Sequence, residues 1–192
     1  MVVVTVGILA LQGAFLEHAR SVAACGGRPV EIRKPEQLDD CRALIIPGGE
    51  STAIGKLMDQ FGLFDAVRRF GADGRPIFGT CAGMVLLARE IEGLQQPRLG
   101  LMNIAVKRNA FGRQVDSFEA DIYVPVLGEA PVRGVFIRAP YVTAVGRGVE
   151  TLASFDGKVV LVRQGRLLAG AFHPELTADT RLHRYFLSFL DE

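Results

Sequence analysis

The 192-residue sequence has no tryptophan, only three histidines and three cysteines, and no excess of charge of either sign. Its 22 Lys and Arg residues nearly balance its 21 Asp and Glu residues, which gives a formal net charge of +1. Such a chain lacks the electrostatic field typical of proteins that bind nucleic acid or anionic membranes. The few aromatic residues also form no stripe on which nucleic-acid bases would stack.

The apolar N-terminal run, from Val2 to Leu11, carries no charged side chain, and the first charged residue is Glu17. The run lacks the basic start of a signal peptide and is too short to span a bilayer. Its β-branched residues instead predict a buried parallel strand. We therefore expect a chain that is neither exported nor held in a membrane.

The three cysteines, Cys25, Cys41 and Cys81, cannot all pair with one another. Without an export signal, reduced thiols in the cytoplasm are the expected state, and a free nucleophilic thiol persists there. No cluster of Cys and His has the spacing of a metal site, so we expect no metal. Cys25 and Cys41 are interpreted as structural residues.

Strand and helix patterns alternate through the N-terminal part of the sequence. Short apolar runs predict strands, and the segments between them have helical spacing. The expected strands cover residues 2–11, 29–33, 43–46 and the residues just before Cys81, and the expected helices cover 14–24, about 51–58, 64–70 and the residues just after Cys81. Ser51 or Thr52 is the expected cap of the second helix. This alternation predicts a parallel sheet with helices on both faces.

The pattern changes from about residue 104, where short strand patterns are separated by Gly and Pro. Strands are expected at 104–107, 118–126, 132–137, 151–155, 159–164 and 167–172, with a closing helix at 182–190. Gln164-Gly165-Arg166 is typical of a hairpin turn, so some of these strands should be antiparallel. With 49% hydrophobic residues, no repeat and no linker, residues 1–192 are expected to form a single domain.

Cys81 occupies the most informative position in the sequence. It lies in Gly79-Thr80-Cys81-Ala82-Gly83, where an apolar strand turns directly into a helix pattern. This arrangement is typical of a nucleophile elbow, in which glycines allow a tight turn and the start of the helix favours a thiolate and an oxyanion. The alternative interpretation is a buried, inert cysteine.

His173 is the candidate base for this nucleophile. It follows the expected strand 167–172 and precedes Glu175 by two positions, which places both side chains on one side of an extended chain. Glu175 would then orient one ring nitrogen of His173 while the other faces Cys81, as in a catalytic triad. Glu175 alternatively serves only as a charge at the start of the next segment. The other two histidines, His18 and His183, are expected to be surface residues of helices.

A glycine turn follows the strand at 43–46 in Pro47-Gly48-Gly49-Glu50-Ser51. At the carboxyl end of a parallel strand, this turn would lie near Cys81 and could offer backbone N–H groups to an oxyanion. The simpler alternative is a tight turn before a capped helix. Arg108 and Arg138 each end a short strand pattern, where an arginine is usually a solvated charge.

Five segments in this order make the chain resemble one family. They are Leu11-Gln12-Gly13-Ala14, Pro47-Gly48-Gly49-Glu50-Ser51-Thr52, Gly79-Thr80-Cys81-Ala82-Gly83-Met84, Arg113-Gln114-Val115-Asp116-Ser117-Phe118 and His173-Pro174-Glu175. With them the sequence resembles the glutaminase subunits of pyridoxal 5'-phosphate synthase, a family of class I (triad) glutamine amidotransferases, from about residue 7 to about residue 190.

The resemblance implies a fold and a set of site residues. The fold would be three-layered and flavodoxin-like, with a mainly parallel central sheet, helices on both faces and some antiparallel strands in the C-terminal half. The family's nucleophile, base and orienting carboxylate map to Cys81, His173 and Glu175, and Gly49 and Ala82 would supply the oxyanion hole. Its glutamine contacts map to Gly49, Glu50, Ser51, Arg108, Ile137 and Arg138.

The resemblance also implies the reaction and the partner. The expected activity is hydrolysis of L-glutamine to L-glutamate and ammonia through a Cys81 thioester, without a cofactor. Ammonia would pass to a synthase subunit, itself a barrel enzyme, that builds the vitamin B6 cofactor, in a cytoplasmic hetero-oligomer. Two alternatives remain: another thiol hydrolase on the same fold, such as a peptidase or deglycase, and a non-catalytic glutamine-binding regulatory subunit.

Overall fold

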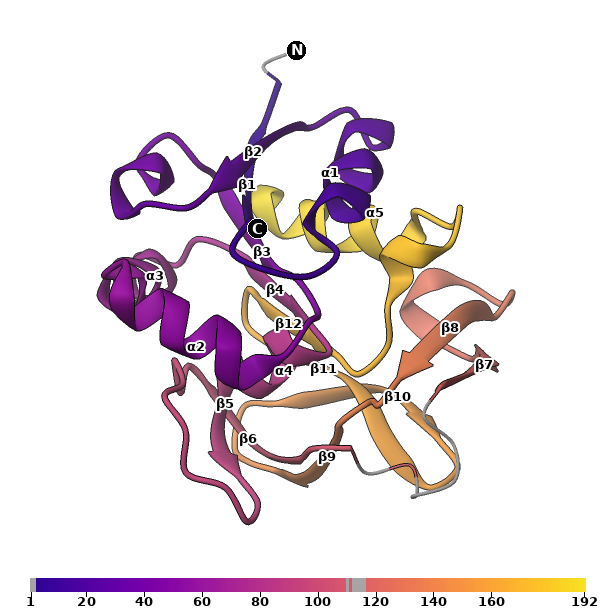
Figure 1. Cartoon of the computed structure of the whole chain (residues 1–192). Helices are drawn as coiled ribbons and strands as arrows, with labels where there is room; N and C mark the ends of the chain where they lie inside the picture. Colours follow the sequence, from indigo (N-terminus) through magenta and orange to yellow (C-terminus); the bar gives the residue numbers. More distant parts are fainter. Residues whose placement is uncertain (1–2, 110, 112–116) are drawn as a thin grey trace.

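A computed structural model describes residues 3–109, 111 and 117–192 of the chain. It is an α/β structure with a long, mostly parallel sheet at its centre (Figure 1). The strands, in chain order, are β1 (Thr5–Leu9), β2 (Arg28–Ile32), β3 (Ala43–Ile46), β4 (Ile77–Thr80), β5 (Ala88–Ile91), β6 (Met102–Lys107), β7 (Ser117–Ile122), β8 (Val132–Ile137), β9 (Tyr141–Val145), β10 (Glu150–Phe155), β11 (Lys158–Gln164) and β12 (Leu167–Gly170).

The order of strands in the main sheet is β2-β1-β3-β4-β12-β11-β9-β6-β5, and β10 pairs with β11 at one side. The first five strands of this order run parallel, whereas β11 is antiparallel to β9, β10 and β12. Strands β1, β3 and β4 are buried along their whole length. This agrees with their continuous apolar sequences, because a central parallel strand is covered on both faces.

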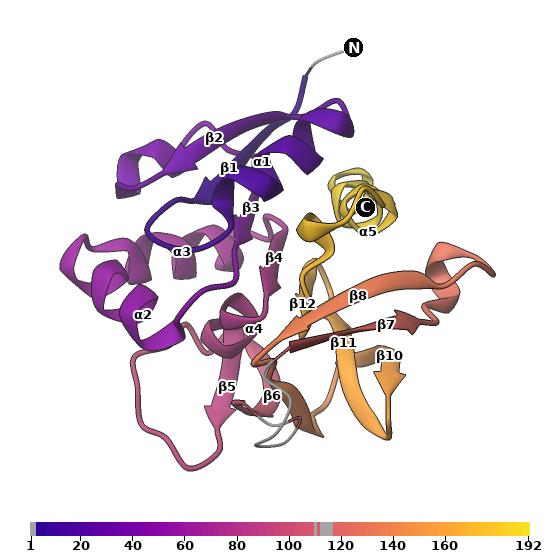
Figure 2. The same ribbon diagram turned by 45° about the vertical axis from the view of Figure 1, so that its right-hand side comes forward.

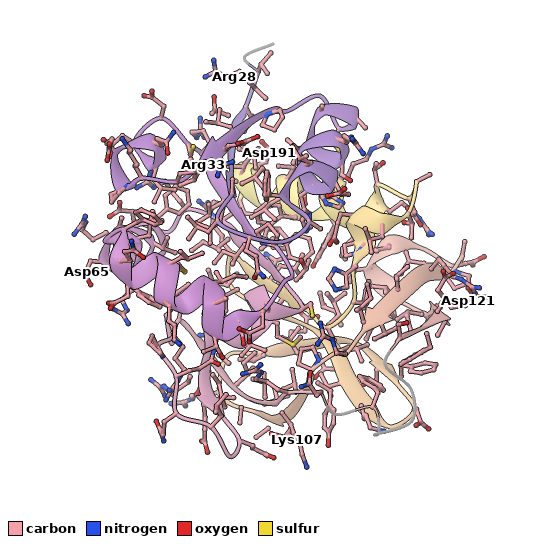
Figure 3. All side chains as sticks on the ribbon, viewed as in Figure 1. Arg28, Arg33, Asp65, Lys107, Asp121 and Asp191 are labelled. Carbon is pink, nitrogen blue, oxygen red and sulfur yellow. The ribbon has the colours of Figure 1, made fainter. Side chains whose placement is uncertain are left out.

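Helices cover both faces of the parallel part of the sheet, as expected (Figure 2). Helices α1 and α5 lie on one face, and α2, α3 and α4 lie on the other. The helices are α1 (Phe15–Ala24), α2 (Ser51–Gln60), α3 (Leu63–Ala72), α4 (Ala82–Leu87) and α5 (Arg181–Ser188). In Figure 3 the labelled side chains Asp65, Lys107 and Asp121 lie at the periphery, and all three residues are exposed, which leaves the apolar interior to the sheet and the inner helix faces.

The antiparallel strands predicted for the C-terminal half are confirmed, including the β11–β12 hairpin with Gly165 at its turn. Strands β7 and β8 form a separate two-stranded antiparallel sheet. Strands β5 and β9 were not expected, since β5 continues an apolar helix pattern and β9 directly follows Pro140. The strand expected at 118–126 ends at Ile122, because Pro125 begins a 3-10 turn.

The cap of α2 also differs from the expectation. The capping residue is Glu50 rather than Ser51 or Thr52, and its carboxylate accepts hydrogen bonds from the backbone N–H groups of Thr52 and Ala53. Within the described part of the chain, no helix is both long enough and apolar enough to cross a membrane.

Candidate active site

Cys81 lies at the sharp junction between β4 and α4, with a φ of 49° and only 7% of its surface exposed. The two flanking glycines leave no room for side chains. A Cβ on Gly79 would lie 2.6 Å from the backbone of Gly83, and a Cβ on Gly83 would lie 2.1 Å from the carbonyl oxygen of Ile46. The elbow therefore depends on glycine at both positions.

The pairing of β4 with β12 brings His173 to this elbow. The two strands are parallel, with Thr80 opposite Gly170, and the N–H of Cys81 donates to the carbonyl of Gly170 at 2.8 Å. His173 follows three residues later, anchored by a hydrogen bond from its N–H to the carbonyl of Val135 at 2.8 Å. The carboxyl ends of the two strands thus place the thiol and the imidazole together at one cavity.

Glu175 lies behind His173 and is almost fully buried. One of its carboxylate oxygens, Oε1, lies 2.7 Å from Nδ1 of His173, which leaves the other ring nitrogen, Nε2, for Cys81. The backbone here is not the extended strand we expected: β12 ends at Gly170, and Pro174–Leu176 forms a 3-10 turn, called η3. The contact therefore arises from a turn that begins at Pro174, not from alternation along a strand.

The environment of His173 favours its protonated form. Burial opposes the positive charge, but the hydrogen bonds to Cys81 and Glu175, together with their negative charge, outweigh burial and raise the pKa of His173 to about 10. At neutral pH this imidazole holds a proton that it can give to a leaving group on the side of Cys81.

The thiol and the imidazole face one cavity of about 310 Å³. Ile137 also contacts the thiol, because its carbonyl oxygen lies 3.8 Å from Sγ of Cys81. The residues expected at the site that line this cavity are Cys81, Ala82, His173, Gly49, Glu50, Ser51, Arg108, Ile137 and Arg138. Glu175 is the exception, since it touches the cavity only through His173.

The glycine turn forms one wall of the cavity against His173. A Cβ on Gly48 would lie 2.3 Å from Cε1 of His173, so a side chain cannot be placed there. The carbonyl oxygen of Gly48 faces Gly13, where a Cβ would lie only 1.7 Å from it. The C=O of Gly48 and the N–H of Gly49 belong to the same trans peptide bond and lie on its opposite sides. The N–H of Gly49 therefore points away from Gly13.

The two arginines of the cavity are held differently. Nη2 of Arg108 lies 3.0 Å from Oε1 of Glu50, and its Nη1 donates to Oε1 of Gln96 at 3.0 Å and to Thr52. Arg138 is exposed, and its guanidinium makes no hydrogen bond to any residue that the structure describes. Gln96, which also accepts from Ser51, was missed because a lone Gln in a loop gives no sequence signal.

Strained backbone is concentrated at this cavity. In the part of the chain that the structure describes, four residues other than glycine have a positive φ, and three of them, Cys81, Asn109 and Arg138, line the cavity. The fourth, Asp156, lies in a hairpin turn between β10 and β11. Such conformations cost about 1 to 3 kcal/mol each and cluster at functional sites.

The prediction that His18 and His183 are surface residues is wrong, because both are completely buried. His18 faces inward from α1 with Ser21 and Val22, and His183 from α5 with Leu182 and Phe186. Spacings of three and four residues along each helix could have placed both histidines on the buried faces. In the described ranges, no group of three or more Cys, His, Asp or Glu side chains is arranged to hold a metal ion.

The fold and the cavity define a class of protein: a triad-type glutamine amidotransferase fold with Cys, His and Glu side chains at the carboxyl edge of its parallel strands. The family model of the SNO glutamine amidotransferases matches residues 8–192. The chain belongs to this family.

Similar proteins agree with this assignment. The chain is 79% identical to pyridoxal 5'-phosphate synthase subunit PdxT of Desulforudis audaxviator, over 97% of this chain and 98% of that protein. It is 66% identical to the protein of the same name in Pelotomaculum thermopropionicum, over 95% and 93% of the two chains. A crystal structure of a glutamine amidotransferase superposes with a TM-score of 0.92 at 53% identity, covering 97% of this chain and 99% of the other.

The buried histidines predict a pH dependence of stability. Burial lowers the pKa of His183 to about 4, and burial, then the charges of His183 and His173, lowers the pKa of His18 well below 6.5. Below about pH 6.5 the unfolded chain binds protons at these positions that the folded chain does not bind. The free energy of unfolding should therefore fall between about pH 6.5 and about pH 4, by up to about 1.4 kcal/mol per pH unit for each histidine.

Urea denaturation of the wild type, His183→Gln and Ser21→Ala at several pH values measures this effect. His183→Gln should show a shallower fall in stability towards acid than the other two proteins, because it lacks one of the titrating groups. If the free energy of unfolding falls equally steeply towards acid pH in all three proteins, the buried imidazoles do not cause the loss of stability.

Proposed function

We propose that this chain hydrolyses L-glutamine to L-glutamate and ammonia through a thioester on Cys81. It is the ammonia-supplying glutaminase subunit of a pyridoxal 5'-phosphate synthase and so serves vitamin B6 biosynthesis. The observation that carries this conclusion is the meeting of Cys81, His173 and Glu175 at one glycine-walled cavity. Membership of the SNO family and identity of 79% to a pyridoxal 5'-phosphate synthase subunit support it.

Glutamine would bind in the cavity with its side-chain amide towards Cys81. Arg138 suits the substrate α-carboxylate, because its guanidinium lines the cavity and is not engaged by described residues. Arg108 is already paired with Glu50, so this pair would present a preformed polar wall to the α-amino group and carboxylate. The backbone of Gly49, Ser51 and Ile137 would complete the contacts.

In the first half-reaction, the Cys81 thiolate attacks the side-chain amide carbon of glutamine. The N–H groups of Gly49 and Ala82 would stabilise the resulting oxyanion, as one lies in the glycine turn and the other at the start of α4. The protonated His173 gives its proton to the amide nitrogen, and ammonia leaves. The product on the enzyme is a γ-glutamyl thioester.

In the second half-reaction, the neutral His173 takes a proton from water, and the water oxygen attacks the thioester carbonyl. Collapse of the second tetrahedral intermediate expels the Cys81 thiolate and releases glutamate, which restores the imidazolium–thiolate pair. Glu175 holds Nδ1 of His173 through both steps, so that Nε2 carries each proton transfer on the side of the thiol. These steps use only the chain, glutamine and water.

Ammonia released into water would be protonated and lose its nucleophilicity, so coupling to an acceptor enzyme is chemically sensible. The chain works with a synthase subunit in a hetero-oligomer, as the names of its relatives indicate. We propose that this partner is a barrel enzyme, that it receives the ammonia directly, and that residues 1–192 act as one domain. The free state of Cys25, Cys41 and Cys81 supports a cytoplasmic setting.

Replacing the nucleophile tests the reaction. With the synthase subunit present, Cys81→Ala should reduce ammonia release from glutamine to background, because no thioester can form. Cys41→Ala is the matched control, since that thiol is buried away from the cavity, and it should retain activity near that of the wild type. Substantial ammonia release by Cys81→Ala would disprove the mechanism.

The same assay without the synthase subunit tests the coupling. We expect the isolated chain to be weakly active and the partner to raise its turnover, because Gly48 and Gly49 allow the turn beside Cys81 more than one backbone state. Turnover by the wild type that is the same with and without the synthase subunit would contradict this coupling.

A further inference from the structure

A buried layer of polar side chains lies behind the proposed triad. Glu175 has one carboxylate oxygen, Oε1, on His173, and its other oxygen, Oε2, faces Nε2 of His18 at 3.3 Å. The side chains of His18 and Glu175 are both fully buried. His18 comes from α1, so this contact joins the proposed triad to a helix far from it in sequence.

This contact matters because Oε2 has little other support. Among the described residues, Oε2 of Glu175 has no well-aligned hydrogen bond, and Nε2 of His18 is the donor within reach. Nε2 also lies 3.1 Å from Oγ1 of Thr80, with which it forms a hydrogen bond, so its 3.3 Å approach to Oε2 is an electrostatic contact beside that bond. A buried carboxylate oxygen without any donor nearby would be costly.

The contacts of His18 determine which ring nitrogens carry hydrogen. A carboxylate only accepts, so Nε2 of His18 must carry the proton if it is to support Glu175. Its Nδ1 then accepts, and it lies 3.0 Å from Nε2 of His183, which must therefore donate. The remaining nitrogen, Nδ1 of His183, is a bare acceptor without a partner in the described structure. One set of neutral tautomers therefore gives an acceptor to each ring N–H of His18 and His183.

Both imidazoles have the neutral state that this arrangement needs. Burial, and then the neighbouring His183 and His173, keep the pKa of His18 well below 6.5, and burial lowers the pKa of His183 to about 4. A second positive charge beside His173 would repel its imidazolium, whereas a neutral His18 supports Glu175 without that repulsion.

We propose that His18, with its tautomer set by His183, is a positioning residue that holds the carboxylate of Glu175 in the rotation at which Oε1 meets His173. The terminal torsion of a glutamate side chain is broad, so a single contact at Oε1 does not fix the carboxylate plane. A second contact at Oε2 fixes the plane of the carboxylate. The carboxylate in turn orients His173 towards Cys81. This inference rests on the proposed glutaminase function, and it adds a second layer behind the triad.

Substitutions at His18 test the proposal in the complex with the synthase subunit. His18→Leu removes the donor, and it should lower kcat for ammonia release by about 10- to 100-fold with KM changed less than about 2-fold, as for other partners that orient a reacting histidine. His18→Gln places an amide N–H near the position of Nε2 and should recover much of kcat. Ser21→Ala on the same helix is the control and should match the wild type, because the Ser21 hydroxyl donates to the carbonyl of Glu17 within α1.

His18→Asn separates positioning from packing if His18→Leu does not fold. Its amide is too short to reach Glu175 but keeps a polar group of similar size, so kcat for His18→Asn should be well below that for His18→Gln. Equal kcat values for the Asn and Gln variants, or a folded His18→Leu with the kcat of the wild type, would overturn the proposal. If either result is obtained while ammonia release by the wild type still depends on Cys81, the positioning role of His18 is rejected and the proposed function stands. Wild-type ammonia release that does not depend on Cys81 removes the proposed function itself.

Discussion

The parallel pairing of β4 with β12 is the constraint on which the rest of the site depends. It places Thr80 opposite Gly170, so the chain leaves the sheet at the same edge on both strands. One exit turns sharply into α4 and presents Cys81, and the other continues to His173 and the 3-10 turn that holds Glu175. Residues 92 positions apart in the sequence therefore meet without any long loop to order them.

Close backbone approaches shape this edge. Gly83 packs against the carbonyl of Ile46, and Gly48 packs against the ring of His173, so no side chain fits at either position. Three of the four non-glycine residues with positive φ in the described chain gather here, while buried imidazoles from α1 and α5 lie behind the site. Backbone strain and buried polar groups both lower the stability of the fold. Their concentration here is explained if they hold the reacting side chains in order.

The sequence predicted the alternating fold and the elbow, because glycine spacing and strand ends are local signals, whereas Glu50, Ser51 and Ile137 were expected at the site only from the family resemblance. It did not predict strands β5 and β9, both of which pair with β6. It placed Glu175 beside His173 for the wrong local reason, and it assigned His18 to the surface. The spacing of His18 with Ser21 and Val22 was the available signal for the buried side of α1, but two of these three residues are polar, which made that signal weak. Residues 113–116 of a motif used for the resemblance lie outside the described residues.

The central claim is that a sulfur atom at the β4–α4 junction carries the glutamyl group during turnover. Mass spectrometry of acid-quenched peptides, prepared from the complex of this chain with its synthase subunit during reaction with glutamine, tests this claim most directly. We expect the added mass of one γ-glutamyl group on the peptide that contains Cys81, and we expect this mass to be lost again when the glutamine is exhausted. Steady ammonia release with that peptide unmodified, or with the adduct on Cys25 or Cys41, would contradict it.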